Sequence, residues 1–492
     1  MKQITLLMMA ALTLVACVED PDQPCASQTW YQDADNDGLG NPDVSLSDCE
    51  QPTGYVANAD DDNDVCAENV DECGVCGGTG APTWYADTDE DGLGDPQNTL
   101  SDCEQPSGYV ANADDADDTV DDNLSPIERA FAGRIDLSNL LNYANQAVPN
   151  YITRDNTDRN EITDAGATLG CVLFYDKSLS VDNTIACASC HKQKEGFGDR
   201  SLASTGVAGT TGRHSMRLIN ARFGDETRFF WDERAMSLES QTTMPIQDHV
   251  EMGFSGQDGD PGINELIVKL EDIDYYEELF TFVYGDAAIT EARMQDALAQ
   301  FVRSIQSFDS RFDAGLTARN GNLAANFPNF TAEENLGKTL FLTPPGGPNG
   351  GGAGCAGCHQ PPEFSIDPAS LNNGVIGVIG DPELADVTVT RTPTLRDMID
   401  PFGNLNGALM HDGSLTTLRD VIDHYNDISI DQANTNLDPR LSGAAPGPGN
   451  PPGQGQNLDL TEGEKDALVA FLETLGGTNV YTDERWSDPF RN

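Results

Sequence analysis

The chain has 492 residues, with 82 Asp and Glu against 27 Lys and Arg, which gives a net charge of −55 at pH 7. This length allows two or three domains, and a hydrophobic share of 38% is sufficient for a folded core. So large an acidic excess excludes nucleic acid as a partner and favours cations and basic proteins, whose approach it accelerates at low salt.

The N-terminal residues predict export. Lys2 precedes an apolar stretch, residues 4–16, that is too short to span a bilayer. The stretch ends in Leu14-Val15-Ala16-Cys17, which resembles a bacterial lipoprotein cleavage signal. We expect residues 1–17 to be the signal peptide with its lipobox; an ordinary signal peptide with an incidental cysteine is the alternative. The mature chain would then lie in the cell envelope, periplasmic or at the outer-membrane surface, attached to the membrane only by lipid on Cys17.

Residues 18–125 form an acidic region without Lys or Arg, and this region contains an internal repeat. Segment 29–61 recurs 54 residues later as segment 83–115, with Trp, Cys and Tyr at matching places. Each copy has a DxDxDGxG run, whose alternating carboxylates are the hard oxygen ligands that Ca²⁺ prefers. The expected calcium ligands are Asp33, Asp35, Asp37, Asp87, Asp89 and Asp91. A disordered acidic spacer is the alternative.

The cysteines of this region are even in number, as expected for disulfides in an exported protein. They are Cys25, Cys49, Cys66, Cys73, Cys76 and Cys103. Their spacing leaves the connectivity open. The DxDxDG runs lack the Glu that would complete an EF-hand, and together with Cys73-Gly-Val-Cys76 they resemble thrombospondin type 3-like repeats.

From about Pro126 the composition predicts a mainly helical globular protein. Thr331 to Glu334 and Thr461 to Glu464 are capping boxes that mark helix starts. Apolar residues from Met294 to Phe308 recur at helical spacing after Thr290. The Pro- and Gly-rich segment from Ser442 to Gln456 predicts a loop before the last helix.

Two CxxCH motifs, Cys187-Ala-Ser-Cys190-His191 and Cys355-Ala-Gly-Cys358-His359, predict two covalently bound c-type haems. In such motifs both thiols form thioethers with the haem and the His ligates iron. A zinc site is the alternative for a single motif, but it would need a second Cys/His pair nearby, and the sequence has only six His. Cys171 is left over and is expected to be buried and inert.

Beyond these motifs, the chain from Leu169 to its C-terminus resembles the bacterial di-haem cytochrome c peroxidase/MauG family. The matching residues are Leu169-Gly170, Leu173 to Asp176, Leu179-Ser180, Trp231 to Ala235, Gln241, Pro245, Glu251-Met252, Arg391 to Arg396, His411 to Ser414 and Gly476-Gly477. The resemblance implies a mainly α fold with two cytochrome c domains, each binding one haem. We expect residues 126–325 to be the domain of the peroxidatic haem and residues 326–492 that of the electron-transfer haem.

The resemblance also implies residue roles. Glu251 is expected to be the acid/base that moves the peroxide proton beside the first haem, and Gln241 to order that pocket. Trp231 is expected to relay electrons between the haems. Arg391 and Arg396 are expected to pair either with haem propionates or with surface carboxylates.

The axial ligands differ from the typical peroxidase pattern. The loop from Ser204 to Gly209, which in peroxidases carries a capping His, has none, so the first haem is expected to stay five-coordinate. His214 aligns with an Asn that holds a calcium ion in the family, which leaves a structural role or a ligand role open for it. Tyr425, fourteen residues after His411, is expected to ligate the second iron, with neighbouring His424 as the alternative.

These observations predict an enzyme that reduces hydrogen peroxide with electrons from a small cytochrome c or a similar redox protein. A MauG-like oxidase of a protein partner is the alternative favoured by Tyr425 and by the loop without His. A third alternative is a non-enzymatic electron-transfer surface cytochrome. The resemblance is also compatible with a homodimer.

Overall fold

The computed structural model describes residues 25–490, apart from residues 63, 64, 68, 69, 122, 226, 347–350 and 444–454. The expected signal peptide and Cys17 lie outside the described residues, as does most of the expected loop between Ser442 and Gln456. The chain divides into two compact units, Met1–Asn123 and Leu124–Asn492. None of the helices in the described part is long and apolar enough to cross a membrane.

The first unit contains two copies of the same antiparallel sheet. Strand order is β2-β1-β3 in one copy and β5-β4-β6 in the other. The strands are β1 (Gln28–Gln32), β2 (Asn41–Asp48), β3 (Tyr55–Val56), β4 (Thr83–Ala86), β5 (Asp95–Ser101) and β6 (Tyr109–Val110). The register agrees as well: Trp30 pairs with Leu46 and Trp84 with Leu100. The recurring sequence therefore produces a recurring structure.

Disulfides join Cys25 to Cys49, Cys66 to Cys76 and Cys73 to Cys103. This pairing uses all six cysteines of the acidic region. The paired cysteines are 24, 10 and 30 residues apart in the sequence. Six cysteines can pair in fifteen ways, and their spacing does not identify the observed pairing.

The second unit is mainly helical, as expected. Its helices are α1 (Pro126–Phe131), α2 (Asp164–Tyr175), α3 (Cys187–Cys190), α4 (Leu238–Thr242), α5 (Ile263–Glu271), α6 (Asp274–Tyr284), α7 (Glu291–Ser304), α8 (Arg311–Ala318), α9 (Ala332–Leu342), α10 (Leu418–Asn426) and α11 (Glu462–Glu473). Two short strands, β7 (His359–Gln360) and β8 (Ser365–Ile366), pair with each other. The capping boxes at Thr331 and Thr461 are confirmed at the starts of α9 and α11, and Thr290 caps α7.

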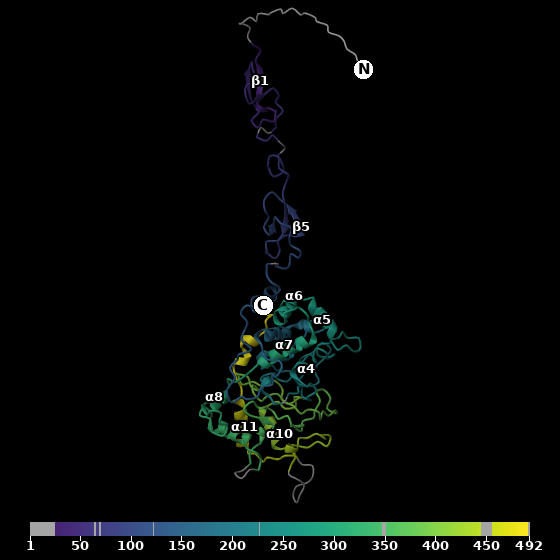
Figure 1. The fold of residues 1–492 in the computed structure, drawn as a ribbon, viewed down its shortest axis with the longest axis vertical. Coiled ribbons are helices and arrows are strands. Elements are labelled where there is room, and N and C mark those ends of the chain that lie inside the picture. Colours follow the sequence, from purple (N-terminus) through teal and green to yellow (C-terminus); the bar gives the residue numbers. More distant parts are fainter. Residues whose placement is uncertain are drawn as a thin grey trace, which may run out of the picture. The chain divides into compact units, whose positions relative to one another are not determined.

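Two hydrophobic cores fill this unit. The first is built mainly on α2, α6 and α7, and the second on α8, α9 and α11. Figure 1 shows α4 to α7 at one end of the unit and α8, α10 and α11 at the other. Cys171 of α2 is buried in the first core, as expected, and burial raises the pKa of its thiol.

Each core contains the same helix crossing. A Cβ added at Gly170 of α2 would lie 2.0 Å from the Ala297 carbonyl of α7, and one at Gly337 of α9 would lie 1.8 Å from the Ala467 carbonyl of α11. Only glycine permits so close an approach of two helix backbones. The two halves therefore repeat one arrangement, in which a helix precedes a CxxCH motif and a later helix crosses it.

The cores do not divide where the two domains were expected to meet, between residues 325 and 326. Phe312 and Leu316 of α8 pack in the second core, and Val480 and Trp486 near the C-terminus return to the first core. The Trp486 indole nitrogen donates a hydrogen bond to the Ser304 hydroxyl at 3.1 Å.

Candidate functional site

The first CxxCH motif opens onto a cavity of about 380 Å³. Cys190 and His191 line it, together with Glu251, Gln241 and Trp231. His191 Nδ1 lies 3.2 Å from the Phe197 carbonyl. Burial lowers the pKa of His191 to about 4, so the imidazole is neutral at physiological pH, as a metal ligand must be.

The second CxxCH motif opens onto a cavity of about 450 Å³, lined by Cys355, Cys358 and His359. Burial lowers the pKa of His359 to about 4 as well. Its Nδ1 is buried and has no hydrogen-bond partner among the described residues. Both cavities have the size and apolar character of cofactor sites.

The residues at the two motifs fit haem c and do not fit zinc. The four motif cysteines form no disulfide, and burial raises the pKa of each thiol. The groups of three candidate metal ligands within the described residues consist of aspartates of the first unit, so neither motif has the second Cys/His pair that zinc requires. Uncharged thiols and a neutral imidazole beside an apolar cavity suit two thioether bonds and an iron ligand.

The Glu251 side chain reaches the first cavity from the segment after α4. Burial, assisted by the charge of Asp248 and opposed by that of Arg234, raises the pKa of Glu251 to about 7. A carboxyl group with this pKa can both accept and return a proton near neutral pH. The structure thus brings Glu251 and His191 together at one cavity, as the sequence analysis predicted.

The loop from Ser204 to Gly209 lies against the backbone of Glu251. Val207 donates its N–H to the Glu251 carbonyl at 3.1 Å, and Ala208 donates to the Val250 carbonyl at 3.2 Å. This loop fixes the backbone of Glu251 while bringing no imidazole to the cavity.

Trp231 belongs to the wall between the two cavities, because it lines both of them. The indole is 9% exposed, and its nitrogen donates to the His214 carbonyl at 2.7 Å. Its own carbonyl accepts the N–H groups of Thr390 and Arg391, at 2.9 and 3.0 Å. Trp231 is thus held by hydrogen bonds at its indole nitrogen and at its carbonyl, and its role as an electron relay stays a prediction.

His214 lies in the same wall, because it lines both cavities. It is 6% exposed, its Nδ1 lies 3.2 Å from the Leu202 carbonyl, and its N–H donates to the His411 carbonyl at 2.7 Å. A Cβ at Gly407 would meet its Nε2 at 2.6 Å, so the imidazole packs tightly against that backbone.

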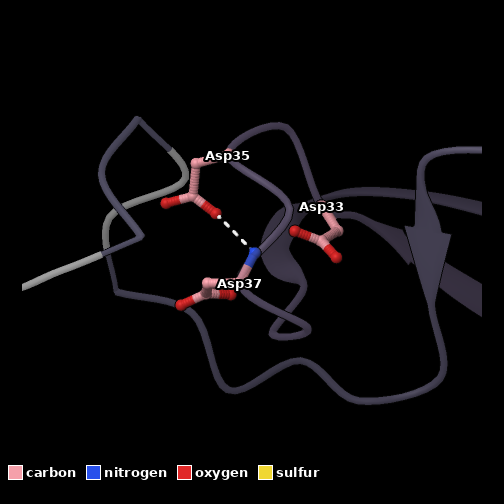
Figure 2. Close-up of side chains that lie close together, drawn as sticks. All are labelled: Asp33, Asp35 and Asp37. Carbon is pink, nitrogen blue, oxygen red and sulfur yellow. Dashed lines mark hydrogen bonds between the residues drawn. The ribbon is translucent and has the colours of Figure 1, made fainter.

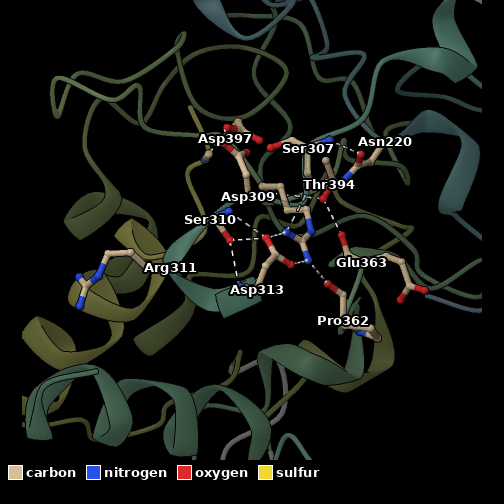
Figure 3. A network of polar contacts seen from close by, with 12 residues as sticks. Asn220, Ser307, Asp309, Ser310, Arg311, Asp313, Pro362, Glu363, Thr394 and Asp397 are labelled. Carbon is tan, nitrogen blue, oxygen red and sulfur yellow. Dashed lines mark hydrogen bonds and ion pairs between the residues drawn. The ribbon is translucent and has the colours of Figure 1, made fainter. Parts of the chain in front are cut away.

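Arg391 and Arg396, for which the same roles were expected, occupy different environments in the structure. Arg391 lines both cavities, where propionate pairing stays a prediction. Arg396 lines neither cavity: it is fully buried and forms two hydrogen bonds with Asp313, at 2.8 and 2.9 Å. Figure 3 shows Asp313 in this polar network, with Ser310 and Pro362 close by. Arg396 therefore pairs neither with a haem propionate nor with a surface carboxylate, and both expectations are wrong. Its guanidinium forms a buried ion pair that joins the segment after Pro393 to Asp313 of α8.

The sequence analysis missed Arg217. This residue lines both cavities, and its Nε has no hydrogen-bond partner in the described part of the chain. Its Nη2 donates to the Thr394 carbonyl at 3.0 Å. A partly buried guanidinium, whose buried Nε has no hydrogen-bond partner among the described residues, suits an anionic group of a cofactor. No motif identified it, because its position between the cavities arises only from tertiary packing.

On α10, Tyr425 lines the second cavity and adjacent His424 does not. Thr417 caps this helix, and its side chain accepts the Asp420 N–H. Met410, just before His411, lines the same cavity.

In the first unit, Asp33, Asp35 and Asp37 form one cluster and Asp87, Asp89 and Asp91 another, with ligand atoms within 4.8 Å of one another. Figure 2 shows the first cluster, in which the Asp37 N–H donates to Asp35 Oδ1 at 3.2 Å. Burial and neighbouring carboxylates raise the pKa of Asp35 and of Asp89. A third group joins Asp89 to Asp115 and Asp118, which the sequence analysis did not select.

The comparisons with known proteins agree with this site. The sequence profile described as di-haem cytochrome c peroxidase matches residues 164–320. The methylamine utilization protein MauG of Methylorubrum extorquens is 30% identical over 329 residues, covering 64% of this chain and 79% of that protein. The cytochrome c551 peroxidase of Nitrosomonas europaea is 26% identical over 339 residues, 66% of this chain and 82% of that protein. A solved structure of a MauG-like protein associated with microbial copper homeostasis is 27% identical with a TM-score of 0.54, over 70% of this chain and 99% of that one.

The fold and the site define an oxidoreductase that acts on peroxide. The chain belongs to the di-haem cytochrome c peroxidase/MauG family. The alternative of a non-enzymatic electron carrier is therefore set aside.

Proposed function

We propose that this enzyme binds two haems c, on His191 and His359, and reduces hydrogen peroxide to water with electrons from a small cytochrome c. The observation that carries the proposal is Glu251, a carboxyl with a pKa of about 7 in the cavity of His191. The haem iron supplies peroxide binding and electron transfer. The acidic excess of the chain suits a basic donor.

The reaction H₂O₂ + 2H⁺ + 2e⁻ → 2H₂O requires a proton to move from one peroxide oxygen to the other. The ionised Glu251 carboxylate accepts the proton of the attacking oxygen and returns it to the leaving oxygen, which departs as water. Gln241 lines the same cavity and orients peroxide by hydrogen bonding. Trp231, in the wall shared by the cavities, passes electrons from the second site to the first.

A MauG-like oxidation of a protein partner is the second candidate. Two observations favour it: the loop from Ser204 to Gly209 brings no His to the first cavity, and Tyr425 lines the second. In that case Trp231 would carry oxidising equivalents outward instead of electrons inward.

Steady-state oxidation of a reduced mono-haem cytochrome c by H₂O₂ separates the two candidates. Fast turnover without prior reduction of the enzyme supports the peroxidase. No turnover, combined with a lasting peroxide-induced spectral change, supports the oxidase. If neither turnover nor a spectral change occurs, both candidates are wrong.

We also propose that the first unit binds calcium and that lipid on Cys17 holds the protein in the cell envelope. Supporting the calcium proposal, the buried oxygens Asp33 Oδ1, Asp35 Oδ2, Asp87 Oδ1 and Asp89 Oδ2 have no hydrogen-bond partner in the described part. Carboxylates in this arrangement repel one another unless a cation neutralises them. Membrane fractionation of Cys17→Ala tests the anchor: the variant should leave the membrane fraction.

A further inference from the structure

Asn373 contacts Tyr425 and Met410, which line the second cavity, and also neighbouring His424. The Asn373 amide, which lines the second cavity, donates to the Tyr425 phenol oxygen at 3.1 Å and lies 3.2 Å from the Met410 sulfur. Because an amide carries two N–H hydrogens, it can donate to both atoms at once. The phenol oxygen and the thioether sulfur are therefore both within reach of one amide nitrogen.

The same residue holds His424 outside the cavity. His424 Nε2 lies 3.0 Å from the Asn373 backbone carbonyl. On a helix, adjacent residues point about 100° apart, so the turn of α10 that presents Tyr425 to the cavity directs His424 to this carbonyl. The imidazole nitrogen best suited to a metal is thus occupied by the main chain.

Asn373 is itself fixed by its surroundings. Its Oδ1 accepts the Val375 N–H at 3.1 Å. The preceding Asn372 is fully buried, and its amide donates to the carbonyls of Val375 and Val389 at 3.1 and 3.2 Å. The amide of Asn373 is therefore oriented by a loop that is itself hydrogen-bonded.

Met410 is held in an unfavourable backbone conformation. Its φ is +66°, in the left-handed region that residues with long side chains rarely adopt. Residues held in this region cluster at functional sites. Here the conformation accompanies a thioether that lines the second cavity beside the Tyr425 phenol.

We propose that Asn373 is a positioning residue that makes Tyr425 the distal ligand of the haem on His359, with Met410 held beside it as a reserve ligand. This inference rests on the proposed function, which places a haem in the second cavity. A thioether is a softer ligand than a phenol oxygen and raises the reduction potential of haem iron. Loss of the Asn373 amide should release Tyr425 and allow Met410 to bind.

The test compares near-infrared absorption and the reduction potential of the second haem in the ferric holoprotein. Wild type should lack the sulfur-to-iron charge-transfer band. Asn373→Leu should gain this band and show a higher potential, and the Asn373→Leu/Met410→Leu double variant should lose the band again. Asn373→Leu leaves the backbone carbonyl that holds His424. Exposed Asn457 provides the control, because Asn457→Leu removes an amide elsewhere and should leave the spectrum unchanged.

Asn373→Asp is a second variant of the same size, and an ionised Asp side chain cannot donate a hydrogen bond to Tyr425 or Met410. If both Asn373 variants load haem and keep the wild-type spectrum, Asn373 does not select the ligand. Should wild type already show the sulfur band, or should His424→Ala alone alter its spectrum, the Tyr425 assignment fails together with this inference. The peroxide reaction at the first haem, measured in parallel, reports separately on the proposed function.

Discussion

Replacement of Glu251 by Gln tests the central chemical step. The amide keeps the shape of the carboxyl but cannot accept a proton. General acid/base catalysis contributes about 10²–10⁴-fold, and with a pKa of about 7 half of the wild-type population carries the base at pH 7. We therefore expect Glu251→Gln to slow the peroxide reaction about 50- to 5,000-fold at pH 7.

The assay is stopped-flow absorption of the first haem after mixing with H₂O₂, between pH 5 and 9. In wild type the rate should rise with pH and level off above about 7, because only the ionised carboxylate is the base. At pH 6 about a tenth of the molecules carry the base, so the rate should be about a tenth of the plateau. Glu251→Gln should remove this dependence.

Asp248 and Arg234 provide controls of opposite sign, because the charge of Asp248 raises the pKa of Glu251 and that of Arg234 lowers it. Asp248→Asn should move the profile to lower pH while its side-chain oxygen can still accept the Val250 and Glu251 N–H groups. Arg234→Gln should move it to higher pH. A Glu251→Gln rate within tenfold of wild type, with both haems loaded, would refute the role of Glu251.

Three further results are expected. Trp231→Phe should slow electron exchange between the haems in rapid-mixing experiments while the first peroxide step keeps its rate; equal exchange rates would exclude Trp231 as the relay. Arg396→Met should lower the free energy of unfolding by about 3–5 kcal/mol, because it leaves Asp313 charged and buried without its partner, and the Arg396→Met/Asp313→Asn double variant should recover part of that loss in denaturant titrations. Removal of calcium with a chelator should lower the melting temperature of the first unit and leave the haem spectra unchanged; an unchanged melting temperature, with no calcium bound in isothermal titration, would contradict the calcium proposal.

The sequence alone determined the local chemistry of this protein. The CxxCH motifs, the repeated aspartate runs and the capping boxes at Thr331 and Thr461 are readable because each depends on residues only a few positions apart. The family resemblance then selected Glu251, Gln241 and Trp231, which the structure places at the first cavity. Its distance of fourteen residues from His411 favours Tyr425 over His424 as the second ligand, and of the two only Tyr425 lines the second cavity.

Tertiary structure decided what depends on distant contacts. The disulfide pairing, the return of Trp486 to the first core and the burial of Arg396 against Asp313 join positions that sequence spacing does not relate. Arg217 and Asn373 belong to no sequence motif. An arginine or an asparagine can contact a bound cofactor or its ligands only where the folded chain places it beside the cavity. Sequence therefore specifies which groups can react, whereas packing specifies which of them share a site and which are held apart.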